Sequence, residues 1–221
     1  MDHGERETHS SNRRLASLTA RILEARRRVP AQRALLVGIS GIDGSGKGYI
    51  TACLNEQLRR LGHNVAVICA DDWLNLPHVC INHDNPAEHF YEHALRLDEM
   101  FGRLIIPLKQ NRDISLTANC ADPKAIAFRD ERYDFRNIDI VLLEGIFLFK
   151  PTYRHHFDLS LWIDCSFETA LRRAIARGQE GLPPAETRRA FETIYFPAQR
   201  IHLASDNPRD AADVIFRNGK L

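Results

Sequence analysis

Glycines, a serine and a lysine between residues 41 and 48 are spaced so that they could bind phosphate groups. The residues are Gly41, Ile42, Asp43, Gly44, Ser45, Gly46, Lys47 and Gly48, and the first seven fit the pattern G-x-x-x-x-G-K-[ST]. Glycines let backbone N–H groups turn towards phosphate oxygens, and a lysine adds positive charge at the β- and γ-phosphates. We therefore expect this segment to bind a nucleotide, with Lys47 as a catalytic contact.

Gly48 departs from the pattern, because a Ser or Thr hydroxyl that ligates Mg²⁺ is expected at the eighth position. Thr51 lies near one helical turn further on and cannot simply substitute. Two interpretations stay open. Either water takes the place of the hydroxyl while acidic residues hold the ion, or catalysis is weakened or lost.

Acidic residues follow two of the apolar segments of the chain. Asp71 and Asp72 come directly after residues 65–70, and Glu144 follows Ile140 to Leu143. An acidic residue at the end of a strand can also be a helix cap or part of a turn. Two acidic sites at adjacent strand ends, facing a phosphate loop, favour a role in holding Mg²⁺ and a substrate hydroxyl. We expect Asp71 and Glu144 to be the metal ligands.

The elements that must position these residues follow from the hydrophobic pattern. Continuous apolar runs separated by helical patterns predict a parallel sheet covered on both faces, with the ligand outside the carboxyl ends of the strands. The expected strands cover 34–40, 65–70, the start of 138–149, 159–164 and 213–216. The expected helices cover 15–28, 48–61, 86–101, 166–177 and 185–204. The stretch 105–137 is weakly patterned and contains one short expected strand, ISLTA.

Composition limits the class of protein. The chain has 221 residues and a formal net charge of +1, which fits one α/β domain over 15–221 after a flexible tail at 1–14 and argues against a nucleic-acid surface. No apolar run is long enough for a membrane span, and the N-terminus has no signal-peptide pattern. The five scattered cysteines never form C-x-x-C, which favours reduced thiols in the cytoplasm. A homo-oligomer stays open.

Several segments together resemble the uridine kinase and phosphoribulokinase branch of the P-loop small-molecule kinases. The matching segments, in the order of that family, are GIDGSGK, ADDWL, LLEGIFLF, ALRRAIARG, YFPAQ and ADVI. They extend over residues 34–217. The resemblance implies a P-loop NTPase fold with a five-stranded parallel sheet, helices on both faces and a helical lid at about 172–184. It also implies ATP and Mg²⁺ as cofactors and a small-molecule acceptor with a hydroxyl group.

The resemblance also implies roles for individual residues. Asp71 aligns with the catalytic aspartate, Trp73 with an aromatic residue that lines the acceptor pocket, and Glu144 with the acid that ends the Walker B strand. Arg173 and Arg177 align with lid arginines that fold over the triphosphate. We also expect Asp72 and Gln199 to contact the acceptor.

The chain departs from the family pattern at Gly48, at Gly178, where the lid usually has Asp, and over 114–137, where no matching His-x-Arg occurs. The sequence therefore does not name the acceptor. It contains no N-K-x-D motif, which counts against a G protein. Two alternatives to a kinase are an ATP-binding regulatory module without transfer activity, which Gly48 motivates, and ATP hydrolysis coupled to a partner.

Overall fold

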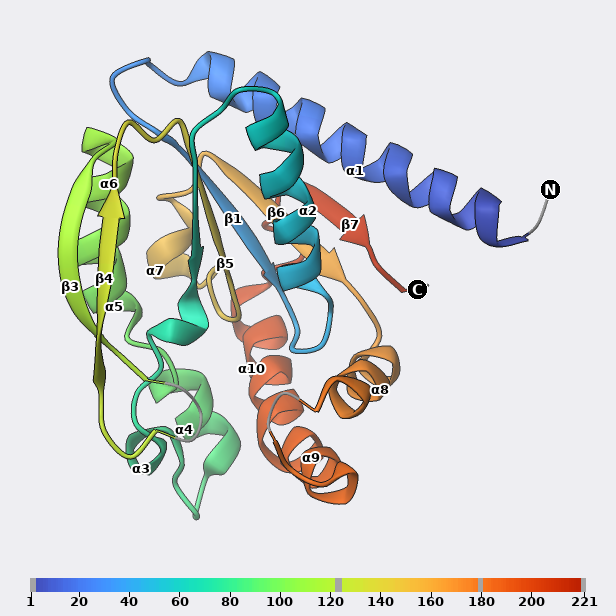
Figure 1. The fold of residues 1–221 in the computed structure, drawn as a ribbon. Coiled ribbons are helices and arrows are strands. Elements are labelled where there is room, and N and C mark those ends of the chain that lie inside the picture. Colours follow the sequence, from blue (N-terminus) through green and yellow to red (C-terminus); the bar gives the residue numbers. More distant parts are fainter. Residues whose placement is uncertain (1–2, 122–124, 179–180, 220–221) are drawn as a thin grey trace.

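The fold is described from a computed structural model, which covers residues 3–121, 125–178 and 181–219, with side chains from residue 13 onwards. Its centre is a five-stranded parallel sheet with the strand order β2-β5-β1-β6-β7 (Figure 1). The strands are β1 (Leu35–Gly41), β2 (Val65–Cys69), β5 (Ile140–Gly145), β6 (Leu159–Asp164) and β7 (Val214–Arg217). The prediction of a five-stranded parallel α/β sheet is confirmed.

Helices cover both faces of this sheet. One apolar cluster joins α1 (His3–Arg28) and α2 (Lys47–Arg60) to side chains of β1, β5 and β6. A second, larger cluster joins the other face to α8 (Phe167–Arg177) and α10 (Phe196–Asp206), among others. Continuous burial along β1 and β6 follows from this double cover, since both sets of side chains are removed from water.

Shorter helices complete the chain. They are α3 (Pro77–Cys80), α4 (Pro86–His93), α5 (Leu97–Met100), α6 (Ile106–Asn111), α7 (Pro151–Arg154) and α9 (Pro184–Ala190). A 3-10 turn covers Ala70–Asp72, and π-helical turns cover Phe101–Ile105 and Phe191–Tyr195. No helix in the described part of the chain has the length and apolar character that crossing a bilayer requires.

The first helix is longer than its apolar spacing predicts. It begins at His3, although the apolar period begins only at Leu15, so most of the segment expected to be a flexible tail has helical backbone. Residues 3–14 are polar and therefore carry no hydrophobic period that could reveal a helix. In Figure 1 this part of α1 extends past the edge of the sheet near β7.

The helix expected over 86–101 is interrupted. The backbone of Ala94 to Arg96 pairs with the chain at 73–75 instead of continuing the helix: Asn75 N–H donates to the Ala94 carbonyl (2.8 Å), and Arg96 N–H donates to the Trp73 carbonyl (2.9 Å). Tertiary hydrogen bonds thus replace helical ones at this point, which the apolar spacing alone does not indicate.

Residues 105–137 contain a hairpin that was only half predicted. The expected short strand is β3 (Ile114–Cys120), and it pairs antiparallel with β4 (Arg129–Phe135), which was not predicted. The resulting two-stranded sheet stands apart from the main one, beside α5 and α6 (Figure 1). Residues 122–124, in the connection between its strands, lie outside the described residues.

Candidate active site

The segment from Gly41 to Gly48 connects the end of β1 to the start of α2, where a phosphate loop is expected. Gly44 and Gly46 adopt left-handed backbone angles, with φ of 74° and 92°. A Cβ on Gly44 would lie 2.4 Å from the carbonyl oxygen of Ala170, so only glycine fits at that position. The loop therefore has the glycine-dependent turns that expose backbone N–H groups at a helix N-terminus.

Lys47 lies within a group of acidic side chains. Its side chain is buried, and its Nζ lies 3.5 Å from Oδ1 of Asp43. Burial alone would lower the pKa of Lys47, but the nearby charges of Asp43, Glu144 and Asp71 outweigh burial and raise it. Lys47 is thus a fixed positive charge beneath the loop.

Asp71 and Asp72 lie in the 3-10 turn that directly follows β2. Burial is the main cause that raises the pKa of Asp71 to about 7; Lys47 opposes this shift, and Asp43 and Glu144 add to it. Burial also raises the pKa of Asp72, and Arg129 on β4 opposes that shift. A carboxyl group with a pKa near neutrality can exchange a proton during a reaction at physiological pH.

Glu144 lies on β5, beside both β1 and β2. Its Oε1 accepts a hydrogen bond from Sγ of Cys69 (3.0 Å), whereas its Oε2 is buried and has no hydrogen-bond partner among the described residues. No group of three or more His, Cys, Asp or Glu side chains in the described part of the chain could hold a metal ion. A buried, unpartnered carboxylate oxygen beside a phosphate loop fits Mg²⁺ that is also ligated by nucleotide phosphates.

Gly48 leaves space next to this carboxylate. A Cβ built on Gly48 would lie 3.9 Å from Oε1 of Glu144, which is an ordinary van der Waals contact. The hydroxyl of Thr51 cannot replace the missing one, since it is buried and donates to the Lys47 carbonyl (2.9 Å). The missing hydroxyl would therefore have been directed at a point close to Glu144.

Comparisons with known proteins found similar sequences and similar folds. Over 157 residues the chain is 29% identical to a uridine kinase of Proteus mirabilis (strain HI4320), which covers 66% of this chain and 70% of the relative. A solved structure described as a possible uridine kinase from Bacillus stearothermophilus matches with a TM-score of 0.72 and 22% identity, over 94% of this chain and 99% of that one. The phosphoribulokinase from Rhodobacter spheroides matches with a TM-score of 0.58 and 13% identity, over 85% and 71% of the two chains.

The resemblance to the uridine kinase and phosphoribulokinase-like P-loop kinases is confirmed. The model of a further family, the methylmalonyl Co-A mutase-associated GTPase MeaB, matches residues 7–74. That match covers most of α1, then β1, the phosphate loop, α2, β2 and the 3-10 turn that contains Asp71 and Asp72.

Trp73 lies in the apolar core beside the hairpin. Its side chain is fully buried, stacks on Tyr133 of β4 with ring centroids 6.1 Å apart, and lies 5.4 Å below the guanidinium of Arg96. Trp73 thus packs against the hairpin that stands beside Asp72, and its contact with the acceptor stays a prediction.

Gln199, expected to contact the acceptor, pairs with the phosphate loop in this structure. It is buried on α10 and forms a reciprocal pair with Asp43 of the phosphate loop. The Asp43 N–H donates to Gln199 Oε1 (3.1 Å), and Gln199 Nε2 donates to Asp43 Oδ2 (2.7 Å). Gln199 therefore fixes the loop residue that accompanies Lys47.

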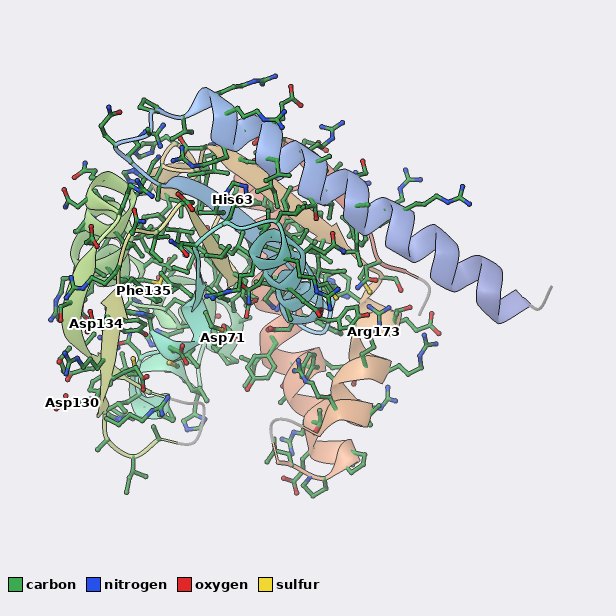
Figure 2. All side chains as sticks on the ribbon, turned by 45° about the horizontal axis from the view of Figure 1, so that its top comes forward. His63, Asp71, Asp130, Asp134, Phe135 and Arg173 are labelled. Carbon is green, nitrogen blue, oxygen red and sulfur yellow. The ribbon has the colours of Figure 1, made fainter. Side chains whose placement is uncertain are left out.

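The two arginines expected to cover the triphosphate differ in their surroundings. Arg177 is exposed in the last turn of α8. Arg173 is half-buried, and its guanidinium donates to the carbonyl oxygens of Ser45 (3.1 Å) and Asn218 (2.8 Å). In the view of Figure 2, Asp71 and Arg173 lie on either side of α2. Sequence reasoning missed Asn218; its place just beyond the carboxyl end of β7 is the signal that could have identified it.

Proposed function

We propose that this protein is an ATP-dependent phosphotransferase that transfers the γ-phosphoryl group to a hydroxyl group of a small-molecule acceptor. One observation carries the proposal. A phosphate loop, the buried Lys47 and a carboxyl group with a pKa of about 7, that of Asp71, lie at the same edge of the sheet and influence each other's charge. This combination suits phosphoryl transfer, which depends on positioning and electrostatic stabilisation.

In this proposal each side chain acts on a defined part of the reaction. Lys47 and the loop N–H groups bind the β- and γ-phosphates. The acceptor oxygen attacks the γ-phosphorus, the bond from that phosphorus to the β,γ-bridging oxygen breaks, and ADP leaves. Asp71 orients the acceptor hydroxyl and takes its proton. Arg177 lies at the end of α8. By the family resemblance, it would approach the phosphates when the lid segment closes.

Asp71 and Glu144 are the residues that would hold Mg²⁺. The unpartnered Oε2 of Glu144 supports this assignment. The ion, when bound, neutralises charge on the phosphates. Gly48 has no side-chain ligand, so in this chain the two carboxylates and water would complete the coordination of the ion.

The names of the relatives suggest which acceptors to test first. Uridine and related nucleosides lead the panel, followed by sugars and small hydroxy acids. The hairpin of β3 and β4 lacks the motif with which the uridine kinase family reads uridine. Its position beside Asp72 is the feature that favours a nucleoside-like acceptor. The cytoplasm as the site of action stays a prediction from the sequence.

The experiment is a measurement of ADP formation from ATP and Mg²⁺, with and without each acceptor. ADP formation that depends on one acceptor supports the proposal, and Lys47→Ala should abolish it while the circular dichroism spectrum is unchanged. ADP formation without any acceptor would instead indicate a hydrolase. ATP binding with no turnover for any acceptor would indicate the binding module that Gly48 suggests.

A further inference from the structure

The carbonyl oxygen of Ser45 in the phosphate loop is held by two segments that are far away in the sequence. Asn218 Nδ2 donates to it at 2.7 Å, from 173 residues further along the chain. Arg173 Nη1 donates to it at 3.1 Å. Arg173 also donates through Nη2 to the Asn218 carbonyl (2.8 Å), so the three residues form a closed triangle of hydrogen bonds.

This triangle determines how one peptide of the loop faces. A trans peptide is planar, so the Ser45 carbonyl and the N–H of Gly46 point in opposite directions. Since Asn218 and Arg173 hold the carbonyl on their side of the loop, the Gly46 N–H is directed to the opposite side, which is the inner side if the loop binds phosphate. Phosphate loops bind their ligand through such inward N–H groups.

Asn218 and Gly46 are also in close steric contact. Gly46 has a left-handed backbone, and a Cβ on it would lie 2.5 Å from Nδ2 of Asn218. The amide side chain of Asn218 thus occupies the space that the missing side chain of Gly46 leaves free. The glycine and the asparagine are complementary parts of one arrangement.

Both donors are anchored by further hydrogen bonds of the fold. Asn218 is 6% exposed, and its own N–H donates to the Asp164 carbonyl (2.8 Å) at the end of β6. Arg173 lies within α8, which Ser166 caps through a hydrogen bond to the Thr169 N–H. The Ser45 peptide is therefore held between the segment that follows β7 and helix α8.

We propose that Asn218 and Arg173 form a clamp that keeps the Ser45 peptide in its phosphate-binding orientation. Both are positioning residues, acting through the loop and not by contact with the acceptor. The proposal assigns Arg173 a role other than that of a cation folding over the triphosphate. The choice of ATP as the phosphate ligand rests on the proposed function above.

The test measures binding of ATP and of inorganic tripolyphosphate by isothermal titration calorimetry to the full chain. Asn218→Ala and Arg173→Ala should each lower the affinity for both ligands by about tenfold, which is the scale of one hydrogen bond. The fold-loss of affinity in the double variant should be smaller than the product of the two single fold-losses, because both donors bind the same carbonyl oxygen. Arg189→Ala, which removes an exposed arginine on α9, should bind like the wild type and controls for loss of charge.

Arg173→Lys separates the clamp from a direct charge interaction. Lysine keeps the positive charge but has no planar fork that can bridge two carbonyl oxygens. A clamp predicts that Arg173→Lys binds as weakly as Arg173→Ala. Recovery of wild-type affinity in Arg173→Lys would overturn the proposal in favour of direct electrostatic attraction.

The remaining outcomes are also decisive. Folded Asn218→Ala with wild-type affinity for both ligands would overturn the clamp, as would a loss confined to ATP, which would indicate contact with the nucleoside. If Asn218→Ala does not fold, Asn218→Asp replaces it, since it has the same size without the Nδ2 donor. If wild-type protein binds ATP but phosphorylates no acceptor, the proposed function fails while these binding comparisons still decide on the clamp.

Discussion

Cys69 and Glu144 face each other across the pairing of β2 with β5, and the thiol of the first holds the carboxylate of the second. The two residues are in register, and Sγ donates to Oε1 at 3.0 Å. Burial and the neighbouring carboxylates raise the pKa of Cys69 far above its usual range, so the thiol remains a protonated donor. This hydrogen bond leaves Oε2 as the carboxylate oxygen available to a metal ion.

Replacing the thiol should therefore change the response to Mg²⁺. Cys69→Ala removes the donor, and we expect the Mg²⁺ concentration for half-maximal ADP formation to rise by about tenfold, as for other groups that orient metal ligands. Cys69→Ser retains a donor and should stay within about twofold of the wild type. Equal Mg²⁺ titration curves for the alanine variant and the wild type would contradict this role for Cys69.

Asp71→Asn should lower kcat by about 10²-fold or more, because it removes the group that accepts the hydroxyl proton. Asp72→Asn is the matched control and should have a smaller effect. Larger loss in Asp72→Asn than in Asp71→Asn would transfer the catalytic role to Asp72.

The pKa of Asp71 also predicts a pH profile. Below about 7 the carboxyl group is protonated and cannot accept a proton, so kcat/KM of the wild type should rise with pH and level off above that value. Asp71→Asn should lack this ascending limb. If kcat/KM of Asp71→Asn still rises with pH and has the same midpoint as the wild type, the titrating group is not Asp71.

Gly48→Ser tests whether the departure from the loop pattern weakens Mg²⁺ binding. The space beside Glu144 accepts a Cβ without a clash, so the variant should fold like the wild type. We expect the serine hydroxyl to lower the half-maximal Mg²⁺ concentration by roughly threefold or more, as one added ligand contact would. Gly48→Ala, which adds the Cβ without the hydroxyl, is the control. An unchanged or poorer Mg²⁺ response in the serine variant would favour a site built around glycine.

Asp158 should stabilise the fold in a pH-dependent way. It accepts two hydrogen bonds from the guanidinium of Arg33 (2.8 and 2.9 Å) and one from the Leu36 N–H (2.9 Å). Burial opposes its ionisation, but these partners and Lys109 outweigh burial and hold its pKa below 3.8, the value for an unfolded chain. Since the folded-state pKa is the lower one, the stabilisation is present above pH 3.8 and is lost as the pH falls through the folded-state pKa.

Asp158→Asn should accordingly lower the free energy of unfolding at pH 7 by roughly 2 kcal/mol, as expected for one broken, partly buried ion pair. Urea denaturation at several pH values measures this. The difference from the wild type should shrink below pH 3.8. Asp210→Asn, at an exposed position, should be neutral throughout; a pH-independent loss for Asp158→Asn would contradict the ionic origin.

The main sheet could be predicted because each of its strands is an apolar run bounded by polar residues. β4 could not be predicted, because only Tyr133 of its seven residues is buried. Its many charged side chains leave no alternation of apolar and polar residues that would indicate a strand. The break at Ala94 was equally hidden, since it depends on backbone pairing with a segment about twenty residues earlier, at Asn75.

In the site, residue types were easier to predict than partners. Lys47, Asp71 and Glu144 follow from motif spacing and strand ends. Arg173 and Gln199 were recognised as polar residues of the site, but both are directed at the loop backbone. The hydrogen-bond partner of each side chain depends on the tertiary packing of α8 and α10, which the sequence pattern does not indicate.

The pairing of Ser45 with Asn218 sets an order of events during synthesis of the chain. The ribosome makes the phosphate loop early, but the amide that holds its carbonyl emerges 173 residues later. A nascent chain that ends before β7 therefore contains every residue of the loop motif without the support of its Ser45 peptide. We therefore expect the loop to bind its nucleotide at full affinity only after residue 218 has been made and β7 has joined the sheet.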